Sequence, residues 1–193
     1  PVNALHIHSG SQMQNLDAQK EALIGLREVA IAINTQSPGK INTLDIGGGL
    51  PSEPLQAQTK MSIYGAMVQE VFRGTSFKLV TEFGQWVHAP AGFAISAIEY
   101  VVRPDRVFIH LGADFFMRDA YTRARPFPLA VVSAEGVLRQ AEERPFDIAG
   151  PLCFAGDYLA HKKNLPGDLE ENDLLIVDET GANTYALWSR HCS

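Results

Sequence analysis

The first half of the chain alternates short apolar runs with stretches in which apolar residues recur every three to four positions. Apolar runs occupy residues 4–8, 41–49 and 77–82, and the helical spacing fills residues 17–36 and 60–73 between them. The apolar positions of the first helical stretch are Ala22, Leu23, Leu26, Val29, Ala30 and Ile33. Strands that alternate with helices predict a parallel sheet of the α/β class.

The ends of the two predicted helices carry their own signals. Asp17 stands where the first helix should begin and is a predicted N-cap. The Ser37–Pro38–Gly39 sequence ends that helix, and Gly74 ends the second one.

The pattern changes after about residue 90, where short apolar runs follow one another with turns between them. Strands are predicted at 93–103, 106–112, 129–134, 136–141, 146–150 and 173–178. Short strands joined by short turns predict a mostly antiparallel β domain. The sequence therefore predicts two parts, residues 1–90 and 91–193.

Composition narrows the class of protein. The chain has 193 residues, of which 46% are hydrophobic and 20% charged, and its formal net charge is -6. A negative charge disfavours nucleic acid and anionic membranes as partners, and no apolar run approaches the roughly 20 residues that span a bilayer. The two cysteines, Cys153 and Cys192, are far apart and predict no disulfide framework, which favours a cytoplasmic location.

Two polar turns follow the first two predicted strands. In LDIGGGLP, Gly47, Gly48 and Gly49 leave backbone N–H groups open to a phosphate, although a glycine triplet is also typical of a plain turn. In HIHSGS, His6 and His8 point to the same side of a strand. They are a conceivable metal pair, but no third ligand with suitable spacing is apparent.

Two further residues stand where ligand chemistry is expected. Glu82 follows the third strand, at the carboxyl end of the sheet, where α/β proteins bind ligands. It is either a solvated loop residue or the partner of a cationic ligand. Cys153 lies in the turn-rich loop GPLCFAGD, which makes it a better candidate for chemistry than a buried cysteine would be.

The order of these motifs along the chain resembles a known family. HxHxGS, DIGGG, TExG, GPxCxxGD and DETGA occur in the order found in fold-type III pyridoxal-phosphate (PLP) decarboxylases, which include the diaminopimelate, ornithine and arginine decarboxylases. The resemblance implies a (β/α)8 barrel followed by a β domain. This chain is similar to the last three barrel strands and most of the β domain, so five strands are expected before it.

The resemblance also implies roles for the first half of the chain. His8 matches the histidine that stacks on the PLP ring, and Ser11 with Gly47–Gly49 matches the phosphate-binding elements. Glu82 matches the carboxylate that pairs with the pyridine nitrogen. That pairing favours a protonated ring, which withdraws electrons more strongly.

In the second half, Cys153 matches the cysteine that protonates the substrate carbon, acting on the cofactor of the partner subunit in a homodimer. Asp157 matches an aspartate of the same loop and is assigned to substrate binding. The FFMRDAY segment implies that Arg118 and Tyr121 contact an amino-acid substrate, with Arg118 on a carboxylate. Arg123 and Arg125 lie close by.

Several positions depart from the family pattern. Gln85 replaces a usual arginine, and Asn183 stands at the position of a tyrosine that reaches the cofactor phosphate. Phe154 replaces the glutamate that reads the far end of diaminopimelate, so the expected substrate is a different amino acid. No lysine of the chain has the sequence context of the lysine that binds PLP covalently.

Three readings of the function follow. The first is a PLP-dependent amino-acid decarboxylase, with a resemblance to the branch that acts on amino-acid conjugates in siderophore biosynthesis. The second is a non-catalytic relative with a binding or regulatory role, which Gln85, Asn183 and the missing lysine favour. The third, an amino-acid racemase of the same fold type, ranks lower because racemases lack the GPxC loop.

Overall fold

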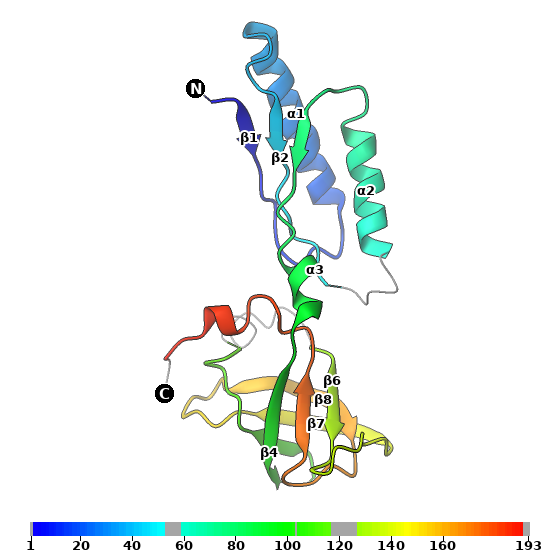
Figure 1. Ribbon diagram of the computed structural model, residues 1–193, viewed down its shortest axis with the longest axis vertical. Helices are drawn as coiled ribbons and strands as arrows, with labels where there is room; N and C mark the ends of the chain where they lie inside the picture. The colour runs from blue at the N-terminus through cyan, green and yellow to red at the C-terminus, as the bar shows by residue number, and fades with distance from the viewer. Residues whose placement is uncertain (1, 53–58, 103, 117–126, 191–193) are drawn as a thin grey trace. The chain divides into compact units, whose positions relative to one another are not determined.

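The computed structural model describes residues 2–52, 59–102, 104–116 and 127–190 and separates into two compact units (Figure 1). The first unit is Pro1–Val87 and the second is His88–Ser193. The sequence placed the division at 90/91, close to this position. A short helix, α3 (Gln85–His88), and a 3-10 turn (Ala89–Ala91) occupy the junction.

The first unit is a three-stranded parallel sheet with two helices, as the alternating pattern predicts. Its strands lie side by side in the order β1-β2-β3. The elements along the chain are β1 (Ala4–His6), α1 (Asp17–Gln36), β2 (Thr43–Asp45), α2 (Thr59–Val71) and β3 (Lys78–Val80). This is the arrangement expected of successive βα units of a barrel.

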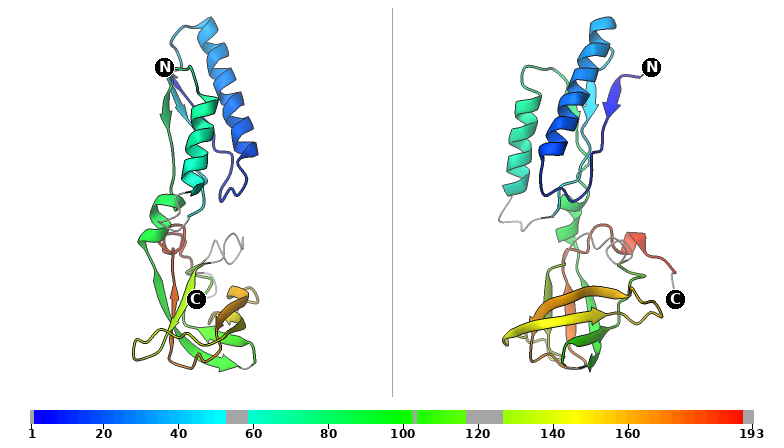
Figure 2. Two further views of the ribbon diagram at one scale, coloured as in Figure 1. Left: turned by 90° about the vertical axis from the view of Figure 1, so that its right-hand side faces the viewer. Right: turned by 180° about the vertical axis from the view of Figure 1, so that it is seen from behind.

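The two faces of this sheet differ in character. Leu5, Leu44 and Leu79 share one row and pack with the helices, which cover one face of the sheet (Figure 2). The next row is His6, Asp45 and Val80. Because strand side chains alternate between faces, this second row points away from the helices.

Helix α1 buries a narrower stripe than its sequence predicts. Leu23, Leu26 and Ala30 are buried, but Val29 is 53% exposed, so its place on the apolar face was a wrong prediction. The capping prediction was also wrong. The N-cap residue is Leu16, and the Asp17 side chain makes no cap bond. Asn15 Oδ1 instead accepts a hydrogen bond from the Asp17 backbone N–H at 2.8 Å.

The second unit is a six-stranded mixed sheet in the order β6-β9-β4-β5-β7-β8. Its strands are β4 (Ala94–Val102), β5 (Arg106–Ile109), β6 (Leu129–Val132), β7 (Glu143–Ala149), β8 (Tyr158–Pro166) and β9 (Leu174–Val177). A 3-10 turn follows at Tyr185–Leu187. The edge strands β6 and β8 also contact each other, so the sheet is curled. Its core contains Ile98, Val107, Phe146, Ile148 and Leu175.

Three features of this sheet differ from the sequence prediction. Strand β8 was missed, because its middle carries His161, Lys162 and Lys163 at a sheet edge where polar side chains meet solvent. Residues 136–141 were predicted as a strand, but in the structure they follow a turn and contribute only an isolated β-bridge between Leu138 and Val132. Strands β5 and β7 pair in parallel, although the other pairings are antiparallel as predicted.

The membrane prediction can be compared with the helices directly. Among the described residues, no helix has the length and apolar character needed to cross a bilayer.

Candidate functional site

The carboxyl ends of β1, β2 and β3 bring three sequence motifs together. The ladder continues past the strands, since Ile7 N–H donates to Asp45 O at 2.9 Å and Ile46 N–H donates to Val80 O at 2.9 Å. The next bond joins Glu82 N–H to Gly47 O at 2.8 Å. The backbone therefore holds HIHSGS, DIGGG and TEFG as neighbours, although they are far apart in the sequence.

The glycine turn fits against the backbone on both sides. Gly47 has a φ of +67°, and a Cβ there would lie 2.6 Å from Ile7 O and 3.0 Å from His8 Nδ1. A Cβ on Gly48 would overlap the Glu82 carbonyl. Only glycine lets this turn pass between the segment that carries His8 and the segment that carries Glu82.

The loop after β1 places the other two predicted residues at the same end. His8 is exposed, and its Nδ1 lies 3.5 Å from the Gly48 N–H. Ser11 is also exposed, and the loop that carries it is tied to the turn by a 3.0 Å bond from Met13 N–H to Gly49 O. The structure thus gathers His8, Ser11, the glycines and Glu82 at one end of one sheet.

Two polar neighbours of Glu82 were not predicted from sequence. His6 Nε2 lies 3.3 Å from Glu82 Oε2, and the polar atoms of His6, Asp45 and Glu82 lie within 4.8 Å of one another. Asp45 Oδ1 also accepts a 3.0 Å bond from Gly47 N–H. The pairing of the strands brings these three side chains together, whereas the sequence alone indicated no third ligand beside His6 and His8.

In the second unit, the loop that carries Cys153 is organised around Asp157. Cys153 is an exposed free thiol. The buried Asp157 carboxylate accepts a backbone N–H from Ala113 and one from Leu152, each at 2.6 Å. Burial raises the pKa of the Asp157 carboxyl above its ordinary value, against the lowering effect of these two N–H donors.

This geometry changes the role of Asp157. Both carboxylate oxygens are occupied by the protein backbone and the residue is 3% exposed, so Asp157 holds the loop. Its predicted contact with substrate does not fit this arrangement. An added Cβ on Gly150 would overlap the same carboxylate, which explains the glycine before Pro151.

Two of the remaining predicted residues, Phe154 and Asn183, lie in loops of the second unit. Phe154 is half-buried, and a Cβ on Gly156 would lie 2.7 Å from its ring. Asn183 has a φ of +59° in the loop after β9, which Thr180 N–H joins to Gly92 O at 2.8 Å. Arg118 and Tyr121, with Arg123 and Arg125, lie outside the described residues, as does Cys192.

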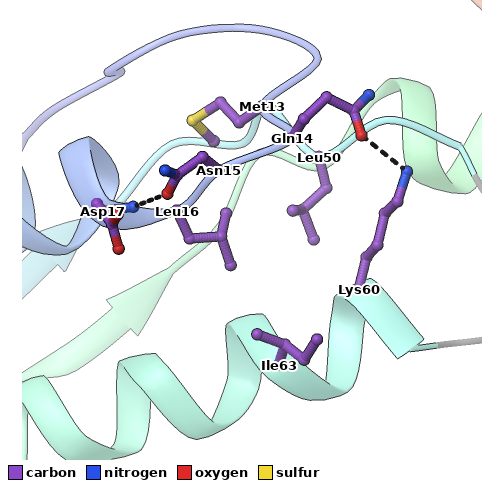
Figure 3. A pocket seen from close by; sticks show the side chains of 8 residues that line it. All are labelled: Met13, Gln14, Asn15, Leu16, Asp17, Leu50, Lys60 and Ile63. Atoms are coloured by element: carbon purple, nitrogen blue, oxygen red, sulfur yellow. Dashed lines mark hydrogen bonds between the residues drawn. The ribbon is translucent and has the colours of Figure 1, made fainter.

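A pocket of about 320 Å³ lies elsewhere in the first unit (Figure 3). Its walls come from Met13–Asp17, Leu50 and the start of α2, and Lys60 Nζ donates to Gln14 Oε1 at 3.3 Å. None of the predicted cofactor residues lines it, so it is distinct from the strand-end cluster.

Comparison with known proteins matches both units. Residues 2–89 match the pyridoxal-binding domain of pyridoxal-dependent decarboxylases, and residues 79–181 match their C-terminal sheet domain. The chain belongs to the pyridoxal-dependent decarboxylase family. The predicted partial barrel and β domain are therefore confirmed.

Individual members of the family agree with this assignment. A diaminopimelate decarboxylase of Pseudomonas aeruginosa is 30% identical over 98% of the chain and 45% of the relative. The structure of a Helicobacter pylori diaminopimelate decarboxylase complexed with L-lysine is similar in fold, with a TM-score of 0.81 and 22% identity over 98% of the chain and 46% of that protein. A Vibrio vulnificus lysine/ornithine decarboxylase complexed with putrescine has a TM-score of 0.75 at 24% identity, over 96% of the chain and 50% of that protein.

The chain spans about half the length of the curated relatives it matches. Within that span, the strand-end cluster fits a pyridoxal phosphate. The glycine turn packs closely against the backbone of the segments that carry His8 and Glu82, and Glu82 supplies a carboxylate at the same sheet end. An anion beside backbone N–H groups and a protonated ring nitrogen beside a carboxylate are both favourable electrostatic pairs.

Proposed function

We propose that the natural protein carrying this chain uses PLP to decarboxylate an amino acid. The observation that supports this most strongly is the convergence of His8, the Gly47–Gly49 turn and Glu82 at the carboxyl ends of three paired strands. Family membership supports the same reaction class. When bound, PLP supplies an electron sink for the bonding pair that the departing CO2 leaves behind.

The chain's own residues then divide the remaining tasks. The glycine turn and Ser11 would hold the phosphate, and His8 would cover a face of the ring. The negative charge of Glu82 would favour a proton on the ring nitrogen. Cys153 would deliver the proton of its Sγ–H to the carbon that loses CO2, so that a C–C bond and the S–H bond break, a C–H bond forms, and the thiolate that remains takes up a proton from solvent.

The substrate we propose is an amino acid other than plain diaminopimelate. Phe154 is apolar and half-buried, so it offers no carboxylate to a distal ammonium group. We further propose a larger amino acid that carries additional carboxylates, such as the conjugates used in siderophore biosynthesis. Arg118, Arg123 and Arg125 would supply the matching positive charge.

We also propose that the protein works as a homodimer with shared sites, in which Cys153 of one subunit serves the cofactor of the other. An exposed thiol is suited to that role when two backbone N–H bonds to the buried Asp157 carboxylate fix the loop that carries it.

A non-catalytic binding protein is the second candidate. Gln85 and Asn183 favour it, because neither carries the group that the family pattern has at its position. Against it stands the joint presence of His8, Glu82 and Cys153, since fold stability does not require these three exposed side chains.

An amino-acid panel separates the two candidates. The PLP-loaded natural protein is incubated with lysine, ornithine, arginine, diaminopimelate and citrate-conjugated diamino acids, and CO2 and amine are measured. We expect CO2 release in equal amount to amine from at least one compound, and less from diaminopimelate than from the preferred substrate. PLP binding without CO2 from any compound would favour the non-catalytic protein.

A further inference from the structure

We propose that His6 is a positioning residue for Glu82, and that Asp45 links this pair to the glycine turn. The inference rests on the proposed function, because it concerns how Glu82 meets the pyridine nitrogen of PLP. His6 and Asp45 lie within the HxHxGS and DIGGG motifs, but neither residue was predicted from the sequence to have a role in cofactor binding.

The pairing of the strands places His6 on the same face of the sheet as Asp45. His6 pairs directly with Asp45, and Asp45 pairs with Val80, so the three side chains form one row on the helix-free face. Glu82 follows Val80 by two positions. His6 Nε2 lies 3.3 Å from Glu82 Oε2.

This contact engages one oxygen of Glu82 and leaves Oε1 as the oxygen to face the ring nitrogen. The Glu82 side chain is 51% exposed, so burial alone does not fix its rotamer. A hydrogen bond from His6 restricts that freedom at one end of the carboxylate. A side chain held in this way loses less conformational entropy when it binds its ligand.

Asp45 connects the same cluster to the phosphate side of the site. Its Oδ1 accepts the 3.0 Å bond from Gly47 N–H, and its carboxylate lies within 4.8 Å of the His6 and Glu82 polar atoms. Two carboxylates this close repel each other unless a hydrogen-bond donor or positive charge lies between them. The His6 imidazole is the hydrogen-bonding group that this cluster offers, with Nε2 3.3 Å from Glu82 Oε2.

The same three side chains are of the types that ligate divalent cations. A cation held there would engage Glu82 and withdraw it from the pyridine nitrogen, which the proposed function needs. The positioning role is therefore the reading that agrees with the rest of the site, and metal binding is an outcome that the experiment must detect.

The test uses His6→Ala and His6→Gln in the natural protein, because Gln retains an N–H donor near the position of Nε2. The dissociation constant of PLP is measured by absorbance titration. We expect His6→Ala to weaken PLP binding about tenfold, by analogy with the loss of groups that orient metal ligands, and His6→Gln to recover most of the affinity. His110→Ala is the matched control, because His110 Nδ1 lies 3.6 Å from Glu99 Oε1 in another exposed His–Glu pair.

Titration with a PLP analogue that carries carbon in place of the ring nitrogen separates positioning from a general structural effect. Because the analogue offers Glu82 no ring nitrogen, His6→Ala should leave its affinity unchanged. Equal losses for PLP and the analogue would overturn the inference, as would unchanged PLP binding in His6→Ala. Stoichiometric Zn²⁺ that the wild type retains and His6→Ala loses would also overturn it.

Different results would contradict the role of His6 and the proposed function. A wild type that binds PLP and releases CO2, beside a His6→Ala variant with the same PLP affinity, contradicts the role of His6 alone. A wild type that binds no PLP contradicts both.

Discussion

Asp157 shows how a single buried carboxylate can fix a loop that carries a reactive side chain. Its two oxygens accept the N–H groups of Ala113 and Leu152, and the loop between Gly150 and Asp157 presents Cys153 to solvent. The amide of Asn offers one acceptor where the carboxylate offers two, so Asp157→Asn leaves one backbone N–H facing another N–H group.

We therefore expect Asp157→Asn to lower the free energy of unfolding by about 1–3 kcal/mol, the usual cost of an unsatisfied buried polar group. Urea denaturation of the natural protein measures it. Asp178→Asn is the control, since Asp178 is exposed and its side chain accepts a hydrogen bond from the neighbouring Glu179 N–H. Equal small effects of both substitutions would show that the loop does not depend on Asp157.

The raised pKa of Asp157 adds a dependence on pH. Between the ordinary aspartate pKa and the raised one, the native state binds more protons than the unfolded state at this position. Its contribution to stability is therefore present at lower pH and is lost as the pH rises through that window. The stability difference between wild type and Asp157→Asn should shrink across the window. A difference that grows with pH would contradict the assignment.

At the scale of elements, the strands and helices of the first unit could be predicted because their periodicities are clear and their glycine and proline signals lie at the ends. Strand β8 could not, because a polar edge strand lacks an alternating apolar face. The motif residues that the structure gathers at the end of this sheet could be singled out by their types and order. The association of His6 with Asp45 and Glu82 could not be predicted, because it depends on register between strands that are distant in sequence.

The glycine turn gives a sharp prediction at this scale. Gly48→Ala would force a Cβ against the Glu82 backbone, so we expect a loss of about 1–3 kcal/mol, as for other overpacked sites, together with weaker PLP binding. Thermal unfolding and PLP titration measure the two effects.

Gly65→Ala is the matched control, because Gly65 lies within α2 and an added Cβ would meet nothing within 4 Å beyond the local helix backbone. It should gain up to about 1 kcal/mol from the higher helix propensity of alanine. A Gly48→Ala protein as stable as Gly65→Ala, with unchanged PLP affinity, would mean that the turn adapts without displacing Glu82.

At the scale of the whole molecule, the proposed shared site makes mixtures of inactive variants informative. Cys153→Ala and Glu82→Gln should each be nearly inactive alone. If the two residues serve one site from different subunits, half of randomly mixed dimers are heterodimers and each contains one intact site, which gives about a quarter of wild-type activity. Absence of recovery in a mixture proven to exchange subunits would place both residues in one subunit's site.

We propose that the natural protein replaces the carboxylate of an amino acid with a proton. Turnover of the PLP-loaded protein in deuterated water, with mass analysis of both products, tests this most directly. We expect CO2 and an amine that carries one solvent deuterium on the carbon that lost CO2. Deuterium in an amino acid that keeps its carboxylate would indicate a racemase, and the absence of both CO2 and deuterium exchange with PLP bound would contradict catalysis.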